Sequence, residues 1–114
     1  MAHDYLVLFV ADVAHDGHAD ALRSAARAVP GAGFFDDGAG GPDRDERTVG
    51  TYVRAGEPQD GLALLRAVAV VSHGLQARFE VQHAEQILGY LDAGRPDAAL
   101  LAEVGPLGDI PDPL

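Results

Sequence analysis

The first apolar segment of the chain is an unbroken run, Tyr5–Val10, rich in residues that favour strands. The run is too short for a helix of ordinary length, so it predicts a first strand. Because successive side chains of a strand point to opposite faces, a run without polar positions indicates a central strand that is covered on both faces.

Two later segments carry apolar residues at helical spacing. The first runs from about Gly17 to Val29, with Asp16 as the expected N-cap and Pro30-Gly31 just after its end. The second runs from about Gly61 to Gly74, with Gly74 as the expected C-cap. Both segments therefore predict amphipathic helices.

Three further segments predict strands. Gly33–Asp36 is a short second strand, and Thr48–Arg54, rich in β-branched residues, is a third. Gln76–His83 is a fourth, in which apolar and polar residues alternate, so one face is wet and the strand suits an edge. Between the second and third strands, the glycines and acids of Asp37–Glu46 predict a mobile hairpin loop.

The C-terminal part of the chain follows the fourth strand. Ala84–Ala93 ends before Gly94, and Pro96–Val104 opens with Pro and Asp, so we expect one or two short helices here. Residues 105–114 contain three prolines and are expected to form a flexible tail. The chain is thus predicted to be one domain over residues 1–104, followed by that tail.

The predicted order of elements is strand, helix, strand, strand, helix, strand. This is the split βαβ arrangement of ferredoxin-like folds. We therefore expect an α+β sandwich, in which a four-stranded antiparallel sheet carries both long helices on one face. The C-terminal helices should pack on or beside this sheet, and 114 residues suffice for one such core.

Charge and composition restrict the partners. Eight basic residues against eighteen acidic ones give a net charge of −10, which repels nucleic acids and anionic membranes. No apolar run approaches the roughly 18 residues needed to span a bilayer, and the start of the chain is not that of a secretory signal. We expect a cytoplasmic protein with neither nucleic acid nor membrane as a partner.

Missing residue types exclude whole classes of chemistry. The chain has no Cys and no Lys, which excludes thiolate nucleophiles, iron–sulfur clusters, Schiff bases and the P-loop lysine. The only serines, Ser24 and Ser72, do not lie in a G-x-S-x-G motif, which argues against a serine hydrolase. We expect no cofactor, and the composition leaves open whether the protein is an enzyme.

Two segments have ligand types that suit a metal ion. His15 and His18 lie three residues apart at a helix start, where two imidazoles can converge on one ion, but a solvated loop capped by Asp16 explains them better. The acids of Asp37–Glu46 suggest calcium, but their spacing is not that of an EF-hand, and a solvated loop is preferred. We expect no bound metal.

Two predicted strands carry polar residues on shared faces. Tyr52 and Arg54 are two residues apart on the third strand, and so are successive members of the set Arg78, Glu80 and Gln82 on the fourth, so each set shares a face. If the two faces belong to one side of the sheet, they can form a polar-rimmed binding surface; the alternative is an exposed face with cross-strand ion pairs. The candidate ligand-binding residues are therefore Tyr52, Arg54, Arg78, Glu80 and His83.

His83 ends the fourth strand and Glu85 follows it. The two could form a proton-transfer pair. The alternative, which we prefer, is a turn at the exit of the strand.

Several segments together resemble the dimeric α+β-barrel branch of ferredoxin-like proteins, which includes antibiotic-biosynthesis monooxygenases and small polyketide cyclases. The likeness rests on Tyr5–Val13, Asp16–Leu22, Pro30-Gly31 and Thr48–Arg54, about half of the chain. The tryptophan common in the third strand of such monooxygenases is absent. The resemblance therefore implies the family's fold more strongly than its enzymology.

The first-ranked function is a homodimeric ligand-binding or accessory module that uses the sheet face. A dimer is expected because helices on one side of the sheet leave the second apolar face of the first strand without cover. A cofactor-independent monooxygenase or cyclase acting on an aromatic small molecule ranks second. An acidic adaptor that binds a basic protein ranks third.

Overall fold

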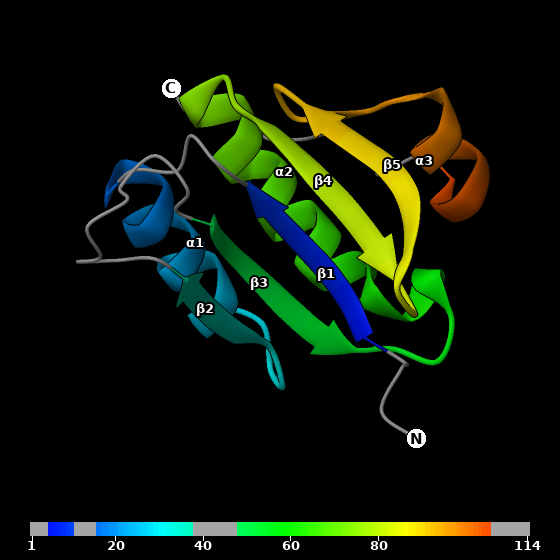
Figure 1. Cartoon of the computed structure of the whole chain (residues 1–114), viewed down its shortest axis with the longest axis horizontal. Helices are drawn as coiled ribbons and strands as arrows, with labels where there is room; N and C mark the ends of the chain where they lie inside the picture. Colours follow the sequence, from blue (N-terminus) through cyan, green and yellow to red (C-terminus); the bar gives the residue numbers. More distant parts are fainter. Residues whose placement is uncertain (1–4, 11–15, 38–47, 106–114) are drawn as a thin grey trace.

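A computed structural model of the chain describes residues 5–10, 16–37 and 48–105. These residues form a sheet and three α-helices (Figure 1). In chain order the elements are β1 (Tyr5–Val10), α1 (Asp16–Arg27), β2 (Gly33–Asp37), β3 (Thr48–Arg54), the 3-10 turn η2 (Pro58–Gly61), α2 (Leu62–Leu75), β4 (Arg78–His83), β5 (Gln86–Asp92), β6 (Arg95–Pro96) and α3 (Ala98–Val104).

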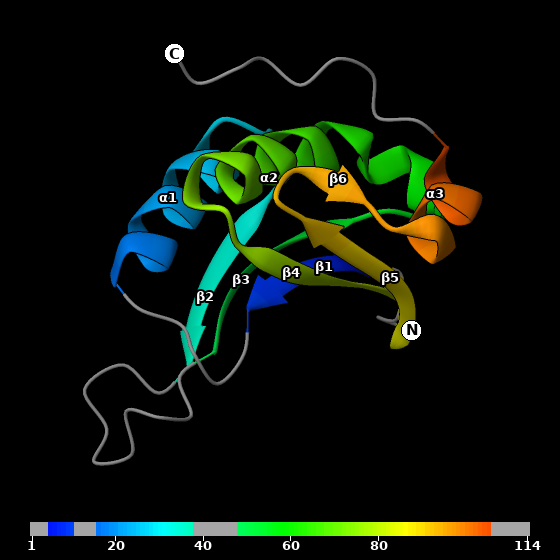
Figure 2. The same ribbon diagram turned by 90° about the horizontal axis from the view of Figure 1, so that it is seen from above.

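The strands form one sheet in the order β2-β3-β1-β4-β5-β6, and all neighbouring pairs are antiparallel. Figure 2 shows α1 and α2 on one side of this sheet, with α3 on the same side beside β5. The predicted α+β class is confirmed, as are the central place of the first strand and the position of both long helices on one face. The sheet has six strands rather than the four expected.

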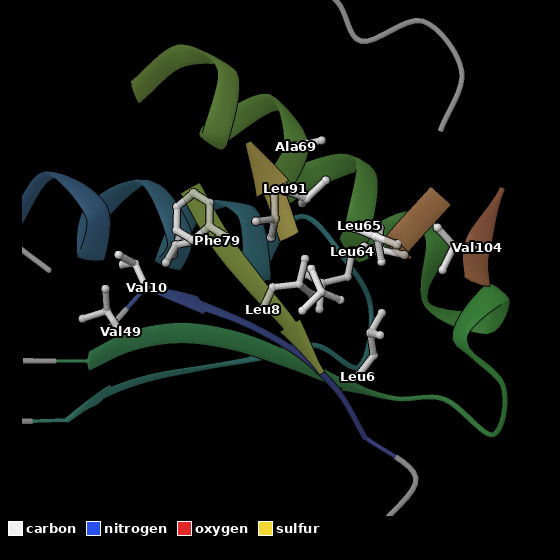
Figure 3. Close-up of a cluster of buried hydrophobic side chains, with 14 of the residues drawn as sticks. Leu6, Leu8, Val10, Val49, Leu64, Leu65, Ala69, Phe79, Leu91 and Val104 are labelled. Atoms are coloured by element: carbon white, nitrogen blue, oxygen red, sulfur yellow. The ribbon is translucent and has the colours of Figure 1, made fainter. Parts of the chain in front are cut away.

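The hydrophobic core lies between the sheet and the helices. Alternate residues of β1 point into it, since Leu6, Leu8 and Val10 are buried. Figure 3 shows these side chains facing residues of α2, with Phe79 of β4 beside them. Leu100 and Val104 of α3 belong to the same cluster, so the third helix extends this core over β5.

Both long helices follow the predicted apolar stripes. In α1 the stripe is buried at Leu22, Ala25 and Ala26. In α2 the helix continues past Gly74, and the predicted C-cap is wrong by two residues. Gln76 takes the left-handed conformation at φ 50°, and its side-chain amide donates to the carbonyl of His73 at 2.7 Å. A hydrogen bond from the capping side chain thus compensates a conformation that usually requires glycine.

The predicted helix over Ala84–Ala93 is wrong, because this segment forms β5. Ala84 and Glu85 have positive φ angles of 51° and 69°, as the two central residues of a type I′ hairpin turn require. The chain therefore folds back at once and pairs with β4. Gly89, at φ 154°, has a conformation that no helix contains. The helix predicted over Pro96–Val104 is confirmed as α3, capped by Asp97.

The fourth strand was expected to suit an edge, and this expectation is also wrong. β4 lies between β1 and β5 and pairs with both. Polar and apolar residues alternate along β4 because one whole face of the sheet lacks a helical layer. A strand inside the sheet therefore also has one solvent-exposed side. For the same reason, the expectation that β1 is covered on both faces does not hold within the described residues: Tyr5, Val7 and Phe9 are only half-buried.

Ser72 joins the end of α2 to the two hairpins beside it. Its buried hydroxyl donates to the carbonyl of Ala77 at 2.6 Å, with the carbonyl of Leu91 at 3.5 Å, and it accepts from the backbone N–H of Gly94 at 2.9 Å. One hydroxyl thus fixes α2 against the strand that follows it and against the turn between β5 and β6. This serine therefore has a structural role in the fold.

Thr51 leads to a stability prediction. Its side chain is fully buried on the helix-facing side of β3, and its hydroxyl has no hydrogen-bond partner among the described residues. A buried polar atom without a partner destabilises a protein by about 1–3 kcal/mol. Thr51→Val keeps the shape and removes this cost, so we expect the free energy of unfolding to rise by about 1 kcal/mol. Urea denaturation measures it.

The control for this prediction is Thr48→Val, which makes the same exchange of a hydroxyl for a methyl group at a half-buried position on the same strand. Its effect should be within about 0.5 kcal/mol. A loss of stability in Thr51→Val would show that the hydroxyl has a partner in solution.

Three expectations fall on residues that the structure does not describe. They are the mobile loop and calcium alternative at Asp37–Glu46, of which the structure describes only Asp37, as the last residue of β2, together with the role of His15 and of the Asp16 side chain, and the tail after residue 105. None of the described helices has the length and apolar character needed to cross a membrane.

Candidate functional site

The candidate site is the face of the sheet opposite the helices, which we call the open face. In the part of the chain that the structure describes, no helix packs on this side (Figure 2). The register aligns Val7 with Tyr52 on one neighbouring strand and Gln82 on the other, and Phe9 with Gly50 and Glu80. Side chains from five strands therefore lie side by side on this face.

Half of the open face is aromatic and apolar. We call this half the aromatic patch; it consists of Tyr5, Val7, Phe9, Phe35 and Tyr52, from β1, β2 and β3. The rings of Tyr5 and Tyr52 meet edge to face with centroids 6.0 Å apart, and the rings of Phe35 and Tyr52 are tilted with centroids 6.4 Å apart. Such pairs fix the rings relative to one another.

Two glycines let these rings lie close to the backbone of the sheet. A Cβ on Gly50 would lie 2.6 Å from the ring of Phe35 and 2.6 Å from the Cβ of Phe9. A Cβ on Gly33 would collide with the ring of Tyr52. The rings of Tyr52 and Phe35 therefore lie across glycines of the neighbouring strands, close to the backbone of the sheet.

The other half of the open face is polar. We call it the polar cluster; it consists of Arg78, Glu80 and Gln82 of β4 with Tyr90 of β5. The amide of Gln82 donates to one oxygen of Glu80, and the Tyr90 hydroxyl donates to the other at 3.4 Å. The guanidinium of Arg78 stacks on the Tyr90 ring, 4.2 Å from its centroid. These side chains hold one another in position. Both oxygens of the Glu80 carboxylate already accept hydrogen bonds.

Arg54 lies at the end of the aromatic patch. It pairs in register with Tyr5, and its side chain is exposed. Among the described residues it has neither an ion pair nor a side-chain hydrogen bond. Arg54 is therefore the arginine that adjoins the aromatic patch, whereas Arg78 lies in the polar cluster and Arg95 lies at the β6 edge of the same face.

His83 lies on the other side of the sheet from the remaining candidates. It pairs with Leu6, whose side chain is in the core, and its Nε2 is 2.7 Å from the carbonyl oxygen of Ala55. Since a carbonyl only accepts, Nε2 carries the proton and donates. The neighbouring Glu85 occupies the hairpin turn. This geometry favours a turn over a proton-transfer pair.

The structure thus brings four of the five candidates to one face but not to one point. Arg54 pairs with Tyr5, and Arg78 lies two residues beyond Glu80, which pairs with Phe9. The two arginines are therefore at opposite ends of the face, about 20 Å apart along the strands. Between them lie rings that the sequence did not single out, those of Tyr5, Phe9 and Phe35, because apolar strand residues were assigned to the core.

His18 is buried near the start of α1, at 7% exposure, with its ring edge to face with that of Phe79. It therefore packs against the core at this end of the helix. Within the described ranges, no three His, Cys, Asp or Glu side chains are grouped as metal ligands would be.

Comparison with protein-family models, with curated proteins and with solved structures gave no match to this chain. A function is therefore inferred from the open face itself.

Proposed function

We propose that the protein is a small homodimeric module that binds a small molecule on the open face. The observation that supports this most directly is the aromatic patch. Tyr5, Phe9, Phe35 and Tyr52 gather on a face without a helical layer among the described residues, and Tyr52 remains 37% exposed. Contiguous exposed apolar surface of this kind marks interaction sites.

A small molecule fits this face better than a nucleic acid. Aromatic side chains on an open sheet stack nucleobases in RNA-binding domains. Those domains, however, need positive charge to attract the phosphate backbone, whereas this chain has a net charge of −10. A compact ligand that stacks on the rings requires no such field.

The ferredoxin-like fold is part of the proposal. β1, α1, β2, β3, α2 and β4 follow the split βαβ order, and β5, β6 and α3 extend the sheet beyond β4. The resemblance to monooxygenases and cyclases keeps an enzyme as the second candidate. Binding ranks first because Glu80, the acid of the polar cluster, already accepts hydrogen bonds at both oxygens. An acidic adaptor ranks third.

The dimer is tested by light scattering. We expect a mass about twice the 11.9 kDa of one chain at micromolar concentration, since a second copy can close the open face and enclose the ligand between the two copies. Tyr52→Asp should shift the protein to the monomer, because a carboxylate would be buried in the interface. The control is Val70→Asp on α2, also 37% exposed but on the helical side, which should remain a dimer. A wild-type monomer would contradict the dimer.

Ligand binding is tested by saturation-transfer NMR with a library of aromatic fragments. We expect several fragments to receive saturation from the wild-type protein and from Val70→Asp, and to lose it with Tyr52→Asp. Signals that persist in Tyr52→Asp would show that fragments bind elsewhere. The absence of any signal would argue against the binding function.

A further inference from the structure

The open face combines two features that select a ligand chemistry. One is the aromatic patch, in which the rings of Tyr52 and Phe35 lie across Gly33 and Gly50 and the ring of Tyr5 meets that of Tyr52. The other is Arg54, whose guanidinium has no partner among the described residues at the end of the same patch. A ring system that covers the patch therefore ends beside an unused cation.

We propose that the ligand of the open face is a planar aromatic carboxylate, with its rings over the aromatic patch and its acid group on Arg54. This proposal rests on the binding function proposed above and specifies its ligand. A guanidinium holds a carboxylate by two parallel hydrogen bonds, and aromatic surfaces stack with one another. Both interactions are available here without rearranging any described contact.

Charge complementarity favours an acid over a base or a neutral ring at this position. The arginine that adjoins the patch attracts an acid rather than a base, although the protein as a whole has a net charge of −10. Among the side chains that the structure describes, the other charged groups of the open face lie away from the Arg54 end of the patch: Glu80 and Arg78 are in the polar cluster, and Asp92 and Arg95 are at the β6 edge. At the Tyr5 end of the aromatic patch, the charge among these side chains is thus the positive charge of Arg54.

The tyrosines provide a local readout. The chain has three tyrosines and no tryptophan. Tyr5 and Tyr52 belong to the aromatic patch, and Tyr90 belongs to the polar cluster, so all three lie on the open face. Carbon-13 labelling of tyrosine rings therefore reports on this face alone and distinguishes its two halves.

The test is an NMR titration of the tyrosine rings with three probes: 2-naphthoate, its neutral analogue 2-naphthalenemethanol, and cyclohexanecarboxylate, which is acidic but not aromatic. We expect naphthoate to shift the Tyr5 and Tyr52 rings more than the Tyr90 ring. It should bind at least about fivefold more tightly than the alcohol, as one charge-assisted contact at a partly exposed site implies. Cyclohexanecarboxylate should bind more weakly than naphthoate.

Variants of Arg54 decide the role of the cation. Arg54→Gln should weaken naphthoate binding by about fivefold and leave binding of the alcohol unchanged. Arg54→Lys should recover part of the loss, because it restores the charge without the planar pair of donors. The matched control is Arg66→Gln on α2, an exposed arginine on the helical layer, which should bind both probes as the wild type does.

The outcomes separate this inference from the function on which it rests. If the alcohol binds as tightly as naphthoate, or if Arg54→Gln binds naphthoate unchanged, the proposed carboxylate contact is wrong. The proposal that the open face binds aromatic molecules is then still supported. If neither aromatic probe moves the tyrosine rings at millimolar concentration, both proposals are wrong.

Discussion

Replacing Gly50 by alanine is expected to lower the free energy of unfolding by about 3 kcal/mol, because the new methyl group has no room. It would lie 2.6 Å from the Cβ of Phe9 and 2.7 Å from the backbone oxygen of Leu8. Both atoms belong to the central strand and cannot move without breaking the pairing of β1 with β3. Urea denaturation at fixed protein concentration measures the change.

The control for Gly50→Ala is the same substitution at Gly74. This glycine is exposed inside α2, and a Cβ added to it would meet no heavy atom within 4 Å other than the helix itself and its chain neighbours. Alanine is the better helix former, so Gly74→Ala should raise the free energy of unfolding by about 1 kcal/mol. Equal effects of the two substitutions would contradict the packing of the aromatic patch on the sheet.

Removing the hydroxyl of Ser72 should also destabilise the fold, by about 2 kcal/mol. Ser72→Ala leaves the buried N–H of Gly94 without its acceptor and removes the hydrogen bond to Ala77. The carbonyl of Ala77 keeps a second donor, the N–H of Ala93, so most of the cost comes from Gly94. Thermal and urea unfolding both report this loss.

Ser24 provides the matched control, as the only other serine of the chain. It is exposed on α1, where Ser24→Ala should change the free energy of unfolding by no more than about 0.5 kcal/mol. If Ser72→Ala were as mild as Ser24→Ala, the hydroxyl would not be what joins α2 to the hairpins.

Local patterns predicted the elements whose period is unambiguous. β3 has the predicted bounds, Thr48–Arg54, because its β-branched residues favour a strand under any packing. β5 was missed because Ala84-Glu85 contains none of the residues that usually mark a tight turn. Two other signals were present, Gly89 within the segment Ala84–Ala93 and Ala93-Gly94 at its end. Once β4 is known to need a second neighbouring strand, Gly89 indicates a strand and Ala93-Gly94 indicates a turn.

The candidate site was predicted in part for a similar reason. The spacing of Tyr52 with Arg54, and of Arg78 with Glu80, correctly gave two pairs on shared faces, because the alternation of a strand is local. Which side of β1 faces the helices, in contrast, depends on the packing of the whole chain and not on local spacing. An unbroken apolar run cannot show that Leu6 is in the core while Tyr5 is on the open face, and therefore the aromatic patch became visible only in the folded chain.

The strand β6 has a consequence for how copies of this chain can associate. It is two residues long and ends at Pro96, which has no N–H to offer a further strand. Short edge strands and prolines block the addition of another strand, and thereby oppose fibril growth and edge-to-edge stacking of sheets. This edge of the sheet is thus protected against aggregation, and edge-to-edge association of two copies would have to use the opposite edge, β2.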